Sequence, residues 1–367
     1  PEAWLVALVA AMIVSDVPQR MLLGRPFAIS IAVLMVILLV TQQSRPSLKH
    51  FIFFTALLIA CTFFHGVWYL WLVPLAAFFF AGQFRWTLLL GGAWLTATAV
   101  SALLTGHPVE YLSQALDMAF HAVGQHMTNR TEVEELRPFG GNVLAIAIVG
   151  ALVGLRLLAK LNTPAWARSP AFWLMCGCWL LGFRVSRFWE DWGWPALMVL
   201  IAVDMQALIQ SRFAADSLRR LLLTVILALA AFLAVTSDLE SRYTKNLNWQ
   251  FLSEKEHPDL KGWMPGKGGI LYTADMGIFY RTFFKNPKAD WRYILGYEPA
   301  LMPTDDFNTY HSILWNNGDA TAYEPWVKKM TPADRLVIPG NGHQRPDVPQ
   351  LEWKYAITGF WIGRTPR

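Results

Sequence analysis

Arginine and carboxylate side chains that could bind a phosphate and move a proton gather in a few short segments. Arg184 and Arg187 are three residues apart, a spacing that places two guanidinium groups on one helical face and suits a phosphate or pyrophosphate. Glu190 and Asp191 follow directly, so pairing between these acids and the arginines is the alternative interpretation. Segment 131–138 holds three carboxylates and an arginine, which could bind a metal ion, act as a base or form a solvated charged run.

Two further residues lie at the ends of apolar segments. Arg25 precedes Pro26 at the start of a predicted helix, where a cation beside the positive end of the helix dipole needs a compensating anion. That anion is either a lipid headgroup or a phosphate-bearing substrate. His65 ends another apolar segment, before Gly66 and the aromatic run 68–71, and either a structural or a catalytic role fits it.

The composition indicates which elements must position these residues. Hydrophobic residues make up 54% of the chain and charged residues only 16%, against about 25% in an average soluble protein. The deficit falls in residues 1–238, whereas 239–367 resemble an ordinary soluble domain. We therefore expect an α-helical polytopic membrane bundle of about nine transmembrane helices, followed by a small mixed α/β soluble domain. The apolar segments are 3–15, 27–41, 50–63, 67–82, 86–104, 142–161, 171–183, 193–210 and 219–237.

The loop charges predict the orientation. Alternate loops separate into a basic set, in which Asp216 is the single acid, and a second set that contains eight acids. The positive-inside rule places the basic set in the cytoplasm. The long loop 105–141 and the C-terminal domain then lie outside, which in a bacterium means a multi-pass protein of the inner (cytoplasmic) membrane with a periplasmic domain. The net charge of +5 contains no basic stripe, which argues against nucleic acid as a partner.

The long loop and the C-terminal domain both show residue patterns that predict secondary structure. Segment 111–126 carries apolar residues at helical spacing and predicts an amphipathic helix at the membrane interface. In the C-terminal domain, 269–273 and 335–338 predict buried strands, 323–330 a short helix and 353–362 a strand or hairpin. Seven tryptophans in this domain either form core or stack on sugars.

Four segments, in their order along the chain, resemble the polytopic type C glycosyltransferases (GT-C superfamily). Segment 24–30 is similar to the "RP…S" helix start of bacterial members, and segment 64–68 to their "LHG" turn before an aromatic helix. Segment 133–138 is similar to a "V-x-E-[WF]-Q-P" segment, and 183–188 to a later "lR-x-x-R" segment. The resemblance covers residues 20–210, and a periplasmic C-terminal domain is usual in that superfamily.

The resemblance implies a site for a polyprenyl-phosphate-linked sugar on the outer face of the membrane. Glu135 is the catalytic acid by motif position, with Asp16 and Glu132 as second choices. Arg25, Arg184 and Arg187, together with His65, would bind the lipid phosphate, and a divalent metal (Mg²⁺ or Mn²⁺) is the implied cofactor. The family's usual catalytic acid follows its first transmembrane helix, so we expect that one or two helices and their loop precede Pro1 in the natural protein.

The leading hypothesis is thus a membrane glycosyltransferase of the cell envelope, or a large fragment of one. Its partners would be membrane lipids, the lipid-linked donor and an unidentified acceptor. One alternative is an O-antigen ligase or polymerase, which would rely on arginine and histidine rather than on a carboxylate and a metal. Another is a non-catalytic subunit that scaffolds a membrane complex.

Overall fold

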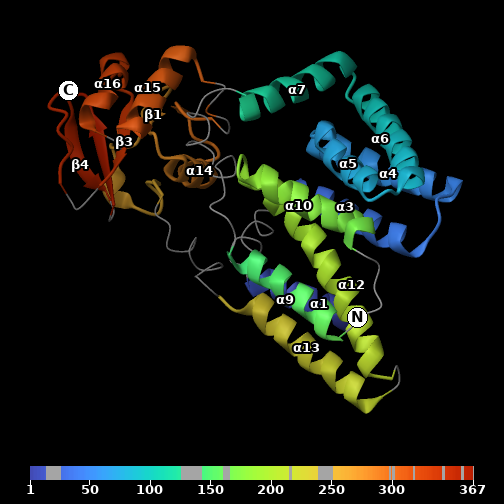
Figure 1. Cartoon of the computed structure of the whole chain (residues 1–367). Coiled ribbons are helices and arrows are strands. Elements are labelled where there is room, and N and C mark those ends of the chain that lie inside the picture. Colours follow the sequence, from blue (N-terminus) through green and yellow to red (C-terminus); the bar gives the residue numbers. More distant parts are fainter. Residues whose placement is uncertain are drawn as a thin grey trace. The chain divides into compact units, whose positions relative to one another are not determined.

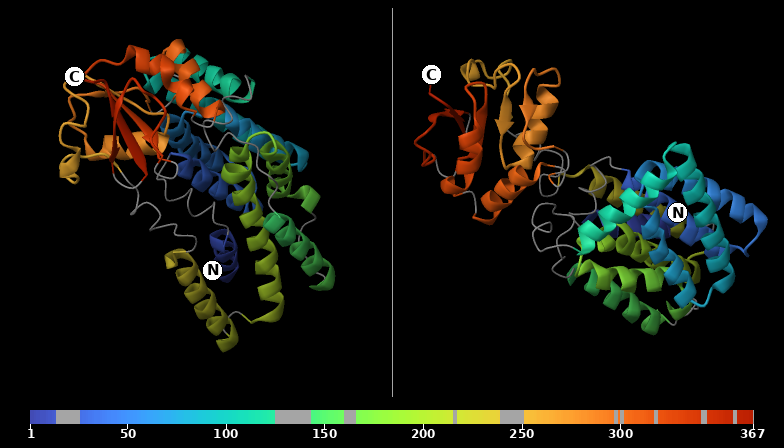
Figure 2. Two further views of the ribbon diagram at one scale, coloured as in Figure 1. Left: turned by 90° about the vertical axis from the view of Figure 1, so that its left-hand side faces the viewer. Right: turned by 90° about the horizontal axis from the view of Figure 1, so that it is seen from above.

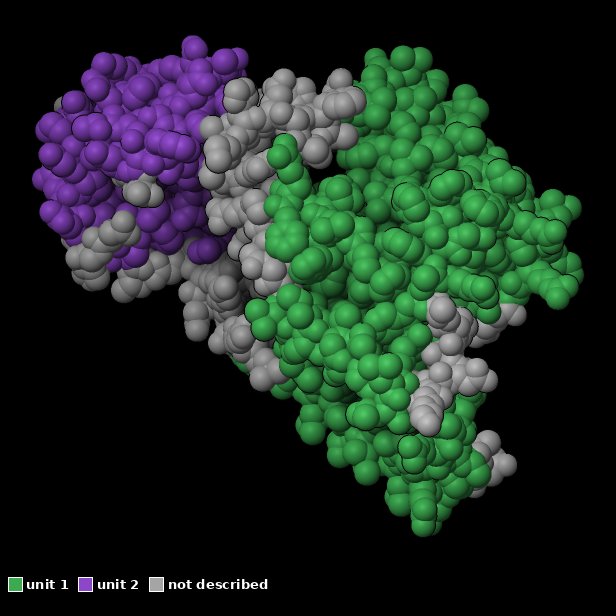
Figure 3. All heavy atoms as spheres, viewed as in Figure 1, with its two compact units in different colours: residues 1–242 green, residues 243–367 purple. Residues whose placement is uncertain are grey.

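The computed structural model describes residues 1–13, 26–124, 143–159, 166–214, 217–238, 251–296, 299, 302–316, 319–340, 344–356 and 359–366. The chain divides into two compact units, residues 1–242 and 243–367 (Figure 3). The first unit is helical, and the second combines helices with a five-stranded sheet.

Each of the nine apolar segments contains a helix. Among the described residues, four helical stretches are long and apolar enough to cross a membrane: α4 (Leu48–His65), α6 (Phe84–Leu104), the continuous stretch Ser186–Arg212 and α13 (Leu218–Thr236). The other five are shorter: α1 (Glu2–Ile13), α3 (Phe27–Gln43), η1 (Trp68–Trp71) with α5 (Leu72–Phe80), α9 (Val143–Ala159) and α10 (Pro170–Gly182). Several helices of the unit can therefore span a membrane, which supports membrane association.

The long stretch that ends at Arg212 is the most buried of the four. It comprises α11 (Ser186–Phe188), a π-helical turn η4 (Trp189–Gly193) and α12 (Trp194–Arg212), and 67% of its apolar window lies inside the protein, against 6% for α13. Helix α1 contacts both α12 and α13, and Figure 1 shows α13 beside α1. Helix α4 packs against α3 and α6, and α5 against α10.

The outward side chains of α13 are large and apolar. Leu221, Val225, Ile226 and Phe232 are each more than half exposed in the isolated chain. Soluble monomers rarely expose a continuous apolar surface of this kind, whereas hydrocarbon chains of a bilayer would cover it.

The amphipathic segment is helical, as its spacing predicted. Helix α7 spans Pro108–Gly124, and the Tyr111 hydroxyl donates a hydrogen bond to the Thr62 carbonyl at 2.7 Å, near the end of α4. The Thr62 hydroxyl in turn lies 2.8 Å from the Ser101 hydroxyl of α6. The ends of α4 and α6 and the start of α7 are thereby joined at one end of the helical unit, which we call the His65 end.

The second unit contains one sheet with the strand order β2-β1-β3-β5-β4. Strands β1 (Ile270–Tyr272), β2 (Arg292–Tyr293) and β3 (Arg335–Pro339) are parallel, and β4 (Glu352–Ala356) and β5 (Phe360–Arg364) add an antiparallel hairpin. These strands confirm the strands predicted at 269–273 and 335–338 and the strand or hairpin predicted at 353–362. The predicted helix 323–330 is present as α16 (Glu324–Lys329), whereas the sequence analysis missed α14 (Met276–Lys285) and α15 (Thr304–Trp315).

Both faces of the sheet are covered, because neighbouring strand residues point to opposite sides. Tyr272 and Leu336 pack with α15 and α16 around the fully buried Trp326. Leu271 and Val337 pack on the other side with Ile278 of α14. Figure 2 shows the strands of this unit with their helices from two directions.

Candidate functional site

Three predicted motifs meet at the His65 end. His65 is the last residue of α4, and Gly66 reverses the chain immediately after it in a left-handed conformation (φ 71°). Ser30 lies in the first turn of α3, and Arg187 lies in α11. A helix start, a helix end and a second helix start thus bring together residues that are 35 and 122 positions apart in sequence.

Hydrogen bonds fix the state of the His65 ring. Its Nδ1 lies 2.7 Å from the Ser30 hydroxyl, and its Nε2 lies 3.3 Å from Nη2 of Arg187. A guanidinium group has only donors, so Nε2 must accept and the ring proton must lie on Nδ1, from which it is donated to Ser30. His65 is therefore neutral and orients Arg187.

Asp191 holds the other edge of Arg187. The Nε of Arg187 donates to Oδ2 of Asp191 at 3.1 Å, and the aspartate side chain is only 3% exposed whereas that of Arg187 is 30% exposed. This ion pair agrees with the alternative interpretation of the segment, in which the acids at 190 and 191 pair with the arginines. Two of the five N–H groups of Arg187 are thus used, and the other three have no acceptor among the residues that the structure describes.

A π-helical turn places Asp191. One extra residue per turn is accommodated in Trp189–Gly193, and such turns are frequent at functional sites. Gly193 is required there, because a Cβ atom at this position would overlap the indole ring of Trp189. Trp192 packs edge-on against Trp71 with ring centroids 5.1 Å apart, which fixes the turn against η1.

Arg184 lies in the turn between α10 and α11. It follows the end of α10, its backbone N–H donates to the Leu181 carbonyl at 2.9 Å, and its side chain is exposed. The expectation that Arg184 and Arg187 share a helical face is wrong, because Val185 between them is extended (φ −147°, ψ 113°) and separates α10 from α11. Arg184 instead lies in the turn after α10, and Arg187 lies in α11, at the same end of the unit.

Ser30 is the serine of the "RP…S" segment 24–30, and the sequence analysis assigned it no role of its own. It is only 2% exposed, and its hydroxyl also lies 3.1 Å from the Cys61 sulfur, one turn before His65. The available signal was a small polar residue in the first turn of an apolar helix. Its partner could not be known, because the pairing of α3 with α4 is a tertiary contact.

The remaining predicted site residues, Asp16, Arg25, Glu132 and Glu135, lie outside the described residues. Within the described ranges, no group of three or more His, Cys, Asp and Glu side chains is arranged to hold a metal ion. Binding of Mg²⁺ or Mn²⁺ by the three carboxylates therefore stays a prediction.

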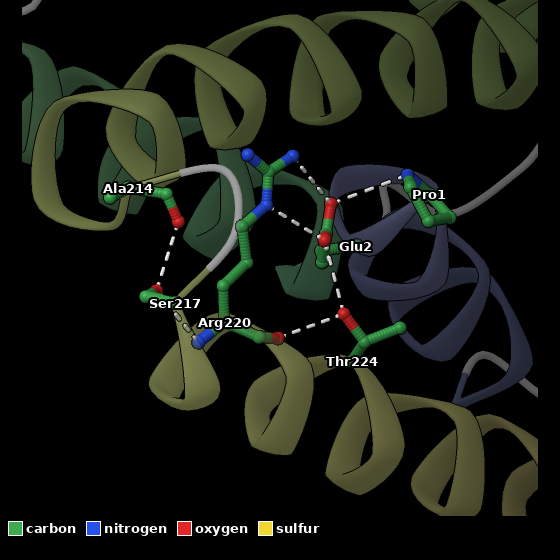
Figure 4. A network of polar contacts seen from close by, with 6 residues as sticks. All are labelled: Pro1, Glu2, Ala214, Ser217, Arg220 and Thr224. Carbon is green, nitrogen blue, oxygen red and sulfur yellow. Dashed lines mark hydrogen bonds and ion pairs between the residues drawn. The ribbon is translucent and has the colours of Figure 1, made fainter.

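Two other buried ion pairs lie far from this cluster and join helices. Asp204 of α12, fully buried, accepts from Nε and Nη2 of Arg156 at 2.8 and 2.7 Å, which links α9 to α12. Asp204 is 13 residues beyond Asp191, or about 20 Å along the helix. Arg220 of α13 donates to both oxygens of Glu2 at 2.9 and 3.3 Å, and so links α1 to α13 (Figure 4).

Comparisons with protein-family models, with curated protein sequences and with solved structures give no match. The type C resemblance therefore rests on the four sequence segments, and its consequences are proposals.

Proposed function

We propose that the protein is a membrane glycosyltransferase of the type C class that takes its sugar from a polyprenyl-phosphate-linked donor. The observation that carries the proposal is the preorganised guanidinium of Arg187. Asp191 and His65 fix two of its edges, it remains partly exposed, and three of its N–H groups have no acceptor among the described residues. A positioned guanidinium of this kind is suited to a phosphate oxygen.

The support for an anionic ligand comes from directed donors rather than from net charge. Arg184 and Arg187 are matched in number by Glu190 and Asp191, so these four side chains sum to zero charge. Arg25 would add one positive charge. A phosphate that leaves with developing negative charge would be stabilised by such fixed donors.

The proposed reaction follows from these roles. Glu135, with Glu132 or Asp16 as the alternative, takes the proton of an acceptor hydroxyl, whose oxygen bonds to the anomeric carbon as the bond to the lipid phosphate breaks. Mg²⁺ or Mn²⁺, when bound, would be held by the carboxylates of segment 131–138 and would neutralise negative charge that develops on the phosphate. The proposed location is the outer face of a bacterial inner membrane, with the C-terminal unit in the periplasm.

The test is transfer of a labelled sugar from a polyprenyl-phosphate donor by the full-length protein in liposomes. Arg187→Ala and Glu135→Gln should each reduce transfer by about 100-fold or more, the scale on which a donor in an oxyanion-type site and a general base contribute. Arg85→Ala is the matched control, because Arg85 is an exposed arginine at the first turn of α6. Transfer that survives in Arg187→Ala at the level of the control would contradict the proposal.

One observation also favours the second candidate, a lipid-linked O-antigen ligase or polymerase. The described cluster is built around an arginine and a histidine, which is the pattern expected of that class. Chelation separates the two: loss of transfer on treatment with EDTA and its recovery with Mg²⁺ or Mn²⁺ support the type C mechanism, and insensitivity supports the ligase. Absence of any transfer, with stable co-purification of partner subunits, would support the scaffold hypothesis.

A further inference from the structure

Helix α14 of the C-terminal unit carries aromatic side chains on both of its faces. Ile278, Phe279 and Thr282 are buried in the core of the unit. Helical spacing places Tyr280 and Phe284 on the opposite side, which we call the outward face, and the Phe284 side chain is 68% exposed. A surface helix normally carries polar residues on that side, so an aromatic outward face indicates contact with something other than water.

Basic side chains border the outward face. Segment 276–289 contains no acid and three cations, which are Arg281, Lys285 and Lys288. The Lys285 ammonium also lies over the ring of Phe251, 4.4 Å from its centroid. Aromatic rings beside lysine and arginine are typical of segments that lie at a membrane–water interface.

Neighbouring acids offset the charge of these cations. Glu256 pairs with Lys285 at 2.9 Å, Asp275 lies beside Arg281 above Gly277, and Asp290 follows two residues after Lys288. The region is thus close to neutral. Its attraction to a bilayer would come mainly from the aromatic rings, and it would not require anionic lipids.

The chain enters the C-terminal unit next to the last turn of α14. Helix α13 ends at Thr236, and residues 237–250 lead from it into the unit. The Leu252 N–H then donates to Oγ1 of Thr282 at 3.3 Å, and Nδ2 of Asn286 donates to the Leu252 carbonyl at 2.7 Å. A linker of this length spans at most about 50 Å. The last turn of α14 is therefore tethered close to the end of a helix that is apolar enough to cross a membrane.

A lipid surface fits the outward face better than a protein partner does. Helix α14 has 10 residues and is about 15 Å long, so this face is far smaller than the roughly 800 Å² that each partner buries in a stable protein interface. A tethered contact can be small, because the linker keeps the local concentration of the membrane high.

We propose that the outward face of α14 docks on the membrane leaflet at which α13 ends, with the ring of Phe284 among the lipid headgroups. Tyr280 would lie in the same layer, where its ring is apolar and its hydroxyl can reach a polar partner. Lys288 is exposed and forms no ion pair with any described residue, so its ammonium can reach a lipid phosphate. The inference rests on the membrane association of the helical unit and not on sugar transfer.

The first experiment uses the full chain in phosphatidylcholine nanodiscs. The photoreactive amino acid p-benzoylphenylalanine replaces Phe284, and its adducts are identified by mass spectrometry. The control carries the same amino acid in place of Trp315, which is 67% exposed against 68% for Phe284 but lies in α15, on the other side of the sheet. We expect lipid adducts at position 284 and few at position 315. Equal yields overturn the inference, and so do adducts of position 284 with residues 1–242, because the helical unit would then cover α14.

The second experiment measures what the Phe284 ring contributes. The photoreactive amino acid moves to position 287, which is exposed in the turn after α14, and lipid adducts are compared between Phe284→Ser and Trp315→Ser. Both variants replace an exposed aromatic side chain, so both should fold. Phe284→Ser should lower the adduct yield about tenfold, the lower end of what burial of a phenylalanine contributes, and Trp315→Ser should leave it unchanged. The same yield in both variants would mean that Phe284 does not enter the bilayer.

Discussion

Nε2 of His65 lies 3.3 Å from Nη2 of Arg187, across 122 residues of sequence. Since Arg187 can only donate, His65 accepts and acts as a positioning residue for the guanidinium. His65→Leu should lower the affinity for polyprenyl phosphate about tenfold, the lower range for a hydrogen bond to a charged group. His65→Gln, which keeps an acceptor, should recover part of this affinity, as measured by binding of polyprenyl phosphate to the full chain in phosphatidylcholine nanodiscs.

His50 supplies the control on the same helix. Its Nδ1 lies 2.7 Å from the Ser47 hydroxyl at the start of α4, more than four helical turns from His65. His50→Leu should bind the lipid as the wild type does. Equal affinities for His65→Leu and His50→Leu would show that His65 does not position the phosphate-binding group.

Gly193 permits the π-helical turn, and its substitution should destabilise the helical unit. The Cβ atom of Gly193→Ala would overlap the buried ring of Trp189, and overpacking of this kind costs about 1–3 kcal/mol. Gly91→Ala is the control, because Gly91 of α6 has open space at its Cβ. We expect a lower apparent Tm for Gly193→Ala than for Gly91→Ala in detergent. An equal Tm would show that the turn adapts at no cost.

Much of the fold could be predicted because apolar length is a strong signal. Each of the nine apolar segments contains a helix, but among the described residues only four stretches are long and apolar enough to span a membrane, so the predicted number of nine spans is not confirmed. The strands β1 and β3 and the hairpin of β4 and β5 lie at the predicted positions. Helix α14 was missed although its apolar residues recur at helical spacing and Asp275 caps it by accepting from the Ile278 N–H at 3.0 Å. The stretch was interpreted only by its density of aromatic and charged residues, and the helix-capping residue Asp275 was not used.

The site was harder to predict, because its geometry depends on tertiary contacts and on one backbone irregularity. His65 and Arg187 were recognised separately, but nothing in the sequence pairs α4 with α11. Val185 is extended, which a helical spacing argument between Arg184 and Arg187 cannot foresee. The only sequence feature that marks the π-helical turn is the glycine at position 193.

The buried pair of Arg156 and Asp204 should contribute to stability in a way that depends on both partners. Asp204→Leu leaves the Arg156 guanidinium without its bidentate carboxylate, and such a loss typically costs about 3–5 kcal/mol. The double variant Arg156→Met with Asp204→Leu removes both charges and should recover most of that loss.

The measurement for this pair is unfolding of the single and double variants in detergent. Glu324→Gln is the control, since it breaks the exposed pair of Glu324 with Lys328 and should leave the apparent Tm unchanged. A double variant as unstable as Asp204→Leu would mean that the pair itself, rather than the avoidance of a lone buried charge, stabilises the bundle.

Tyr272 should make the C-terminal unit sensitive to alkali. Burial raises the pKa of its phenol from 10.0 to about 12, the carboxylates of Asp334 and Asp306 add to the rise, and Arg292 opposes it. Between these two pH values the unfolded chain releases the proton and the folded chain keeps it, so stability is full below pH 10 and falls as the pH rises to about 12. Burial also raises the pKa of Tyr323, so Tyr272→Phe should flatten this decline without abolishing it. Denaturant unfolding of the full chain, monitored by amide hydrogen exchange in 251–296, measures how the free energy of unfolding falls with pH. An equally steep fall in Tyr272→Phe would mean that other groups cause it.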